Sequence, residues 1–336
     1  MTISSLEDAR TQIAGAMTSI ATPATPDMQI DLEAYRRNLE FMVDRGAVAG
    51  NAILLVAAAG GEFPMLSVVE RKELMTVAVD TVGDRVPIAA SVQSNSTREA
   101  VELAIHAREV GVALGQLSAP YYYPPTPEDI YEFFRDVATQ SGLPIMVYNN
   151  WWNTLNMNTE TVLRLSEIDG IVAVKWSAPS FEQYSRGYEL FGDKLAIIDN
   201  TGQRVHTSML GASAFITHVG NFWPEYPTRI WELIKAKNYE QLTAESAFEM
   251  EWARWTERVN EYTEGEGPFV KAAMDEVGLP SGDPFRPGLP VPAGLRADLA
   301  ELFDAYDVPR IGAASAMAQD SPVGALDGAV AAPPTT

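Results

Sequence analysis

Eight short apolar runs alternate with helical segments along most of this chain, and this alternation restricts the fold more than any other feature. Each run is only a few residues long and nearly free of charged side chains. Continuous apolar runs of this length are typical of parallel strands that are buried on both faces. The eight predicted strands are residues 15–20, 50–57, 86–92, 113–118, 143–148, 170–175, 194–199 and 212–217.

The segments between these runs begin with signals that are typical of helix starts. Asp31 precedes apolar side chains that are spaced on one helical face. Residues 67–70 and 96–99 both have the Ser-x-x-Glu spacing of a capping box. Residues 126–129 place a proline at the first helical position, where its missing N–H costs nothing. Helices are therefore predicted between the strands.

Eight such strand–helix units within residues 15–238 predict an α/β fold, a (β/α)8 TIM barrel. A doubly wound sheet is the alternative, but no Gly-x-Gly-x-x-Gly turn follows the first run. The later pattern is helical only, with helices predicted at 239–262, 268–277 and 293–306. The predicted organisation is an N-terminal arm (1–14), the barrel (15–238), a small C-terminal helical extension (239–311) and a disordered tail (312–336) rich in Ala, Pro, Ser, Thr and Gly.

Composition excludes several classes of function. The chain has 24 Lys and Arg against 45 Asp and Glu, a net charge of −21, which disfavours nucleic acid or an anionic membrane surface as a partner. It has no cysteine, and therefore no thiolate nucleophile or Cys-type zinc site. Asp199 and His218 both fall near a predicted barrel mouth, but two ligands are weak grounds for a metal. Without a targeting signal or an apolar span, a cytoplasmic protein is expected.

Lys175 is the first candidate for chemistry. It ends the sixth apolar run, and barrel active sites are built at the carboxyl ends of the strands. Its nearest acidic neighbours in the sequence are Asp169 and Glu182, so no local partner is evident. Desolvation lowers the pKa of a lysine, and the neutral amine can attack a carbonyl to form a Schiff base. The alternative is a strand-end lysine that reaches solvent.

Three further elements lie at predicted strand ends. Tyr148 ends the fifth run, within reach of Lys175, and either relays protons or is a buried tyrosine with a satisfied hydroxyl. The small residues at 57–61 either bring backbone amides to a carboxylate or form a tight turn. Tyrosines 121–123 stand between prolines, in a loop suited to a pocket wall or a subunit interface.

In this order, these elements resemble the dihydrodipicolinate synthase/N-acetylneuraminate lyase superfamily of class I aldolases, over about residues 12–310. The superfamily's Gly-Thr-Thr-Gly-Glu turn corresponds to Ala-Ala-Gly-Gly-Glu at 58–62. Its Pro-Tyr-Tyr loop is matched at 120–122 and its Tyr-Asn at 148–149. Its Ile-x-x-x-Lys strand, which carries the Schiff-base lysine, is matched by the run that ends at Lys175.

The resemblance implies that Lys175 forms an imine with the keto group of pyruvate or another 2-keto acid. Tyr148 would relay protons, helped by Tyr122 from a neighbouring subunit. The protonated imine is an electron sink, so that a C–C or C–O bond beta to it can break or form. No metal or organic cofactor is implied, and the expected assembly is a homo-oligomer, a dimer or a tetramer. The positions implied to hold the carboxylate, through backbone amides, are Ala59, Gly60, Gly61 and Ile216.

The chain also departs from the superfamily's pattern. Ala59 and Gly60 replace two threonines whose hydroxyls bind the carboxylate and pass protons in the superfamily. Asn153 stands where the synthase branch has an arginine for a second carboxylate, so dihydrodipicolinate synthesis is not expected. Trp151 and Trp152 either form an apolar or aromatic wall of the substrate pocket or pack between subunits or under the C-terminal helices, and the first alternative leads to the hypotheses below.

Three hypotheses follow. The first is an aldolase or hydratase-aldolase whose partner aldehyde is apolar or aromatic, because residues 15–27 and 270–278 resemble the hydratase-aldolase branch. The second is a dehydratase or aldolase of ketodeoxysugar acids, which residues 60–63 resemble. The third is a catalytically silent barrel that binds keto acids, an option raised by the two missing threonines.

Overall fold

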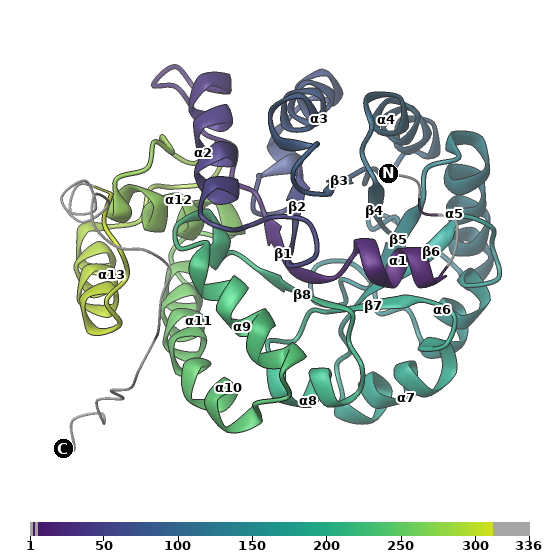
Figure 1. Ribbon diagram of the computed structural model, residues 1–336. Helices are drawn as coiled ribbons and strands as arrows, with labels where there is room; N and C mark the ends of the chain where they lie inside the picture. Colours follow the sequence, from purple (N-terminus) through teal and green to yellow (C-terminus); the bar gives the residue numbers. More distant parts are fainter. Residues whose placement is uncertain (1–2, 4–5, 312–336) are drawn as a thin grey trace.

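The computed structural model describes residue 3 and residues 6–311, and it confirms the predicted TIM barrel. Eight parallel strands close into a barrel in chain order, with β1 paired to both β2 and β8 (Figure 1). The strands are β1 Gly15–Ser19, β2 Ala52–Val56, β3 Ile88–Ser91, β4 Leu114–Ser118, β5 Ile145–Tyr148, β6 Ile171–Trp176, β7 Ala196–Asp199 and β8 Ala214–Thr217.

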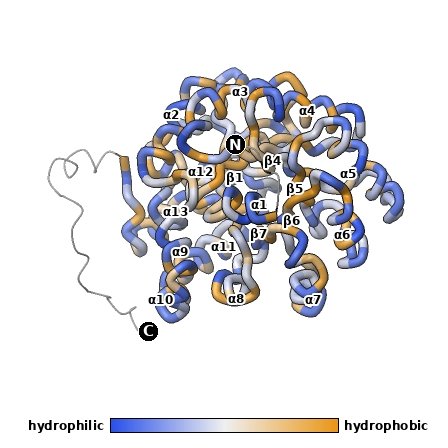
Figure 2. Tube along the Cα trace, turned by 45° about the vertical axis from the view of Figure 1, so that its right-hand side comes forward, coloured by the Kyte–Doolittle hydropathy of each residue, from blue (hydrophilic) through white to orange (hydrophobic). Residues whose placement is uncertain are grey.

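Helices follow the strands as the sequence predicts. They are α2 Leu32–Asp44, α3 Val68–Val82, α4 Thr97–Val110, α5 Pro127–Ser141, α6 Thr159–Leu165, α7 Phe181–Phe191, α8 Arg204–Met209 and α9 Glu225–Lys235, with short 3-10 turns η1 Phe63–Met65 and η2 Val219–Asn221. A further helix, α1 Leu6–Gln12, lies in the predicted N-terminal arm, where the sequence analysis predicts none, and its Ala9 packs with the inner barrel residues. Hydrophobic and hydrophilic positions alternate along these helices (Figure 2), as expected when one face packs against the strands.

The helix-start signals act largely as predicted. Asp31 accepts a hydrogen bond from the Ala34 amide (2.9 Å). Complete capping boxes form at residues 67–70 and 126–129. The box predicted at residues 96–99 is incomplete, because the Glu99 carboxylate accepts from the Ser94 hydroxyl (2.8 Å).

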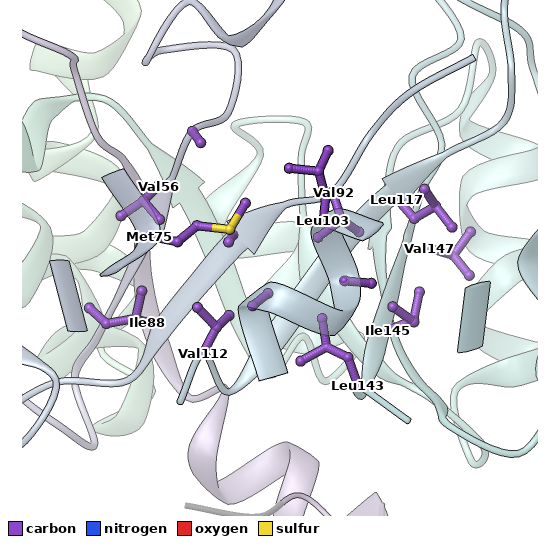
Figure 3. Packing of buried hydrophobic residues seen from close by; sticks show 14 of the residues in the cluster. Val56, Met75, Ile88, Val92, Leu103, Val112, Leu117, Leu143, Ile145 and Val147 are labelled. Atoms are coloured by element: carbon purple, nitrogen blue, oxygen red, sulfur yellow. The ribbon is translucent and has the colours of Figure 1, made fainter. Parts of the chain in front are cut away.

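Two apolar layers hold the barrel together. The outer layer packs strand residues such as Val56 and Ile88 against Met75 of α3 and Leu103 of α4 (Figure 3). The inner layer fills the barrel with small and aliphatic side chains, so that the interior is solid up to its carboxyl end. The inner residues include Met17, Ile53, Leu55, Ala89, Leu114, Met146, Ala173, Ala196, Ile198 and Ala214.

The C-terminal helices group on one side of the barrel (Figure 1). They are α10 Tyr239–Glu245, α11 Ala247–Asn260, α12 Glu266–Val277 and α13 Ala293–Ala305. The prediction of one helix over 239–262 is wrong. Ser246 separates α10 from α11, and its hydroxyl donates to the Leu242 carbonyl (2.7 Å), a bond that bends helices. The predicted disordered tail, 312–336, lies outside the described residues.

Within the described part of the chain, no helix is both long enough and apolar enough to cross a membrane.

A buried ion pair fastens α12 to the turn after β2. Lys271 Nζ lies 2.7 Å from Glu62 Oε2, and both side chains are buried. Each member of the pair has a further partner, since the Phe285 amide donates to Glu62 Oε1 (2.8 Å) and Lys271 donates to the Asp283 carbonyl (2.9 Å). Burial raises the pKa of Glu62 and lowers the pKa of Lys271, and each partner opposes the other's shift.

Lys271→Met is expected to lower the free energy of unfolding by about 3–5 kcal/mol, because it leaves the Glu62 carboxylate buried without its partner. The double variant Glu62→Gln/Lys271→Met should recover most of that loss. Urea unfolding followed by circular dichroism measures both. A single variant within about 1 kcal/mol of the wild type would contradict this account of the pair.

Candidate active site

Lys175 and Tyr148 come together at the carboxyl end of the barrel. They are direct partners in the β5–β6 register. Lys175 Nζ stands 4.1 Å from the centroid of the Tyr148 ring, and the two residues are 5% and 3% exposed. The lysine does not reach solvent, so the alternative of a strand-end lysine in water is wrong.

Burial changes the protonation of both groups. It lowers the pKa of Lys175 to about 8, and the charge of Glu266 opposes this shift. About one amine in ten is then neutral at pH 7, against about one in three thousand for an ordinary lysine. Burial and the charge of Glu266 raise the pKa of Tyr148, while the Asn200 amide lowers it. Tyr148 therefore stays a neutral hydroxyl, which can both donate and accept a proton.

Glu266 and His218 also lie at the site, although no motif in the sequence links the two residues. His218 follows β8, and Glu266 is the first residue of α12. His218 Nε2 lies 2.8 Å from Glu266 Oε2, across 48 positions of sequence. Burial would raise the pKa of Glu266, but His218 and Lys175 together hold it below its ordinary value. Glu266 is therefore a carboxylate at neutral pH.

Arg204 lies at the same end of the barrel, and each of its three guanidinium nitrogens donates to a protein acceptor. Its guanidinium donates to Asp199 (2.8 Å), to Glu249 (3.0 and 3.1 Å) and to the Ile216 carbonyl (2.8 Å). These bonds tie α8 and α11 to the ends of β7 and β8. The Asp199 carboxylate also accepts from the Tyr184 hydroxyl (3.2 Å). In residues 3 and 6–311, no cluster of three or more His, Cys, Asp or Glu could hold a metal ion.

The turn after β2 has no space for one of the missing threonines. A Cβ on Gly60 would lie 2.7 Å from Ser19 Oγ, and a Cβ on Gly61 would lie 2.7 Å from the Ile20 carbonyl oxygen. The Gly60 amide donates to Ser19 Oγ (3.0 Å), and the Gly61 amide donates to the Ala58 carbonyl (3.0 Å). Both amides have partners within the protein, so binding of a substrate carboxylate there, which stays a prediction, requires them to exchange partners.

Of the remaining residues predicted for the site, Trp152 and Asn153 line a cavity, whereas Tyr122 does not. Trp152 lines a cavity and packs edge-on against Trp151 and Tyr148, with ring centroids 5.6 and 6.4 Å away. Asn153 also lines the site. Tyr122 is 76% exposed and points to no described cavity, whereas its neighbour Tyr121 lines one. The role of Tyr122 at an interface between subunits stays a prediction.

Two adjoining cavities open at this end of the barrel. The smaller, about 310 Å³, is lined by Ala59 and Tyr148 among others. The larger, about 800 Å³, extends toward α11 and is lined by Ile216 and His218 among others. Glu266 lines both, and therefore stands where they meet. Cavities with convergent polar groups are typical of ligand sites, and two adjoining cavities can each hold one portion of the same small molecule.

A (β/α)8 barrel with a desolvated lysine against a buried tyrosine at its carboxyl mouth defines a class of protein, the barrels equipped for lysine-imine chemistry. The family comparison agrees with that class. The chain belongs to the dihydrodipicolinate synthetase family, whose sequence profile matches residues 12–305. This confirms the superfamily that the four sequence motifs resemble.

Individual relatives differ in how much of the chain they match. A 4-hydroxy-tetrahydrodipicolinate synthase from Dechloromonas aromatica is 38% identical over 164 residues, which is 48% of this chain and 55% of that protein. The chain thus spans about half the length of the first curated relatives it matches. The Chlorobaculum parvum enzyme of the same name is 32% identical over 69% of this chain and 78% of its own. The crystal structure of dihydrodipicolinate synthase from Aquifex aeolicus superposes with a TM-score of 0.81, at 25% identity, covering 89% of this chain and 99% of that one.

Proposed function

We propose that this protein is a class I lyase that forms an imine between Lys175 and a pyruvate-derived 2-keto acid. The observation that carries the proposal is the buried Lys175 amine, 4.1 Å from the Tyr148 ring centroid, with its pKa lowered to about 8. Membership of a family whose relatives are named as synthases supports it. The missing threonines do not argue for a silent barrel, because lysine and tyrosine are both in place.

The proposed reaction begins with attack of the neutral Lys175 amine on the keto carbon. Tyr148, whose hydroxyl is neutral and adjacent, donates its proton to the developing alkoxide and regains one from the ammonium nitrogen of the adduct. It then donates this proton to the adduct hydroxyl, which leaves as water, and solvent reprotonates Tyr148. The resulting iminium accepts the electron pair of a bond beta to the imine carbon, and that bond breaks. Hydrolysis of the final imine restores the free amine.

For the second half of the substrate, we propose an apolar or aromatic aldehyde. Trp152, Trp252 and Phe269 line the larger cavity and offer ring faces and edges for stacking. Arg204 also lines it, but its donors are committed to protein acceptors. A second carboxylate on the substrate would therefore find no free guanidinium there, which argues against a diacid substrate.

A ketodeoxysugar acid is the second candidate. Asn200, Thr201 and Asn260 also line the larger cavity, and such neutral polar groups suit the hydroxyls of a sugar acid. The two candidates differ in which lining residues carry the binding, so a comparison of substrates separates them.

A substrate panel tests the proposed partner. We expect benzylidenepyruvate-type adducts to be cleaved with a kcat/KM at least about tenfold above that of ketodeoxysugar acids. Trp152→Ala should reduce this preference by about 2- to 13-fold, which corresponds to the 0.5–1.5 kcal/mol of aromatic stacking. Trp151, also predicted as part of the pocket wall, lines neither of the two cavities described and packs on Trp152, so Trp151→Ala should reduce the preference by less than Trp152→Ala does. A tenfold advantage for ketodeoxysugar acids would favour the second candidate instead.

A further inference from the structure

His218 and Glu266 form a hydrogen-bonded pair inside the site that the proposed imine chemistry does not use. Nε2 and Oε2 are 2.8 Å apart, and the two side chains keep 21% and 28% of their surface exposed. The edge of the Phe269 ring packs on the imidazole, with centroids 5.3 Å apart, and so limits its rotation. The pair is thus ordered and still open to a ligand.

The backbone on both sides of Glu266 is also constrained. Gly265 has a φ of +106°, which side-chain-bearing residues rarely adopt. A Cβ on Gly267 would lie 2.2 Å from the Cδ of buried Glu62. Only glycine fits at either position, so the chain holds the Glu266 carboxylate at the junction of the two cavities.

Glu266 differs from the other glutamates that line these cavities. Glu62 is paired with a buried lysine, and Glu249 is paired with a buried arginine. Glu264 is an exposed side chain. Glu266 alone among these four is paired with a histidine, with its Oε2 2.8 Å from His218 Nε2, and its carboxylate is therefore not held by a lysine or an arginine.

Because the imine chemistry occupies Lys175 and Tyr148, the second half of the substrate needs its own proton acceptor. We propose that Glu266 is that catalytic base, and that His218 is the residue that positions it. The proposal rests on the proposed function. It gives a role to a carboxylate that lines both the smaller cavity, beside Tyr148, and the larger cavity proposed for the partner aldehyde.

The proposed step starts from an iminium adduct with a hydroxyl on the carbon beyond the alpha carbon. Glu266 accepts the hydroxyl proton, and the O–H electron pair becomes the second bond of the aldehyde carbonyl. The C–C bond between that carbon and the alpha carbon breaks, and its electron pair forms a double bond between the alpha carbon and the former imine carbon. The π pair of the C=N⁺ bond moves onto nitrogen, which leaves a neutral enamine on Lys175. The enamine carbon then takes a proton from Tyr148, and water hydrolyses the imine. Glu266 loses its proton to solvent, which also reprotonates Tyr148. Nothing is oxidised or reduced.

Glu266→Gln separates this step from imine formation. It keeps the shape of the side chain but removes its basicity, so the turnover of adducts should fall by about 10²- to 10⁴-fold. Trapping of pyruvate on Lys175 by borohydride should be at least as fast as in the wild type at neutral pH, because the charge that opposes deprotonation of Lys175 is gone. The matched control is Glu261→Gln, which removes an exposed carboxylate at the end of α11 that lines neither cavity, and it should stay within about twofold in both assays.

Each outcome decides the proposal. Normal trapping with a large loss of cleavage supports Glu266 as the base. Cleavage within about threefold of the wild type, or equal losses of trapping and cleavage, overturns that role. If the wild type itself is not trapped by any 2-keto acid, the proposed function fails first and this inference fails with it.

Two substitutions of His218 test the positioning role. His218→Gln keeps an N–H donor for Glu266, whereas His218→Leu removes it. We expect the glutamine variant to retain about tenfold more turnover than the leucine variant, with both trapped normally by borohydride. Equal turnover in the two variants, whether high or low, overturns the positioning role.

Discussion

Lys175→Ala should lose all borohydride-dependent labelling by pyruvate and lower turnover by on the order of 10⁵-fold, the scale of losing a covalent nucleophile. The reason is geometric as well as chemical. Lys175 is buried against the ring of Tyr148, which lines the smaller cavity, so a keto group bound in that cavity beside Tyr148 would lie next to the proposed nucleophile. Peptide mass spectrometry of the reduced wild-type protein should place one adduct on the peptide that contains Lys175.

Lys175→Arg is the control for charge, because it keeps a cation at this position but cannot form an imine under these conditions. It should be as inactive as the alanine variant. Lys271 is an internal comparison, since it is also buried but has an ion-pair partner, and it should remain unlabelled. Labelling of Lys175→Ala, or of Lys271 in the wild type, would contradict the assignment.

The same labelling reaction reports the pKa of the amine. Only the neutral amine attacks the keto carbon, so the initial rate should rise with pH and level off above the pKa. Burial lowers that pKa from 10.5 to about 8, so the midpoint should lie near pH 8. A midpoint near pH 10.5 would mean that water reaches the amine in solution.

The fold was predictable because a strand that is buried on both faces needs a continuous apolar run, which can be recognised in the sequence of each strand. The run at 170–175, for example, corresponds closely to β6, Ile171–Trp176. The break between α10 and α11 was not predictable in this way. Apolar periodicity continues through Ser246. The hydrogen bond from its hydroxyl to the Leu242 carbonyl depends on the side-chain conformation of Ser246, which the spacing of apolar residues does not reveal.

Sequence could predict only those site residues whose placement follows from the order and ends of the strands. Lys175 and Tyr148 end neighbouring strands, and the parallel register alone brings them together. Glu266 and His218 meet because α12 packs over the barrel mouth, a contact that depends on the tertiary placement of the extension. The signals available were a histidine after the eighth apolar run and acidic residues before a predicted helix, and neither specifies the other as a partner.

The missing threonines illustrate a different limit. From the sequence, a glycine at position 60 reads as the loss of a hydroxyl. In the structure, Ser19 Oγ from β1 lies 3.0 Å from the Gly60 amide, in space that a side chain at position 60 would need. A hydroxyl is therefore present at this turn, supplied by another strand. A comparison limited to the turn motif misses this hydroxyl, because Ser19 lies on β1 and not in the turn.

Tyr148→Phe should lower turnover by about 10²- to 10⁴-fold, the usual range for a general acid–base group. The loss should affect imine formation as well as cleavage, because the hydroxyl is proposed to shuttle the proton in both steps. Glu266→Gln, in contrast, should affect cleavage alone. Borohydride trapping rates and turnover, measured in parallel for the two variants, therefore distinguish the two groups.

Tyr35→Phe is the matched control for Tyr148→Phe, because Tyr35 is equally buried but lies on α2, among the residues of the outer apolar layer. Both variants remove a single oxygen, so both should keep the fold, as checked by thermal unfolding. If Tyr148→Phe turned over substrate at the wild-type rate, proton transfer would have to come from another group. Glu266, whose charge already raises the pKa of Tyr148, would then be the first to examine for both steps.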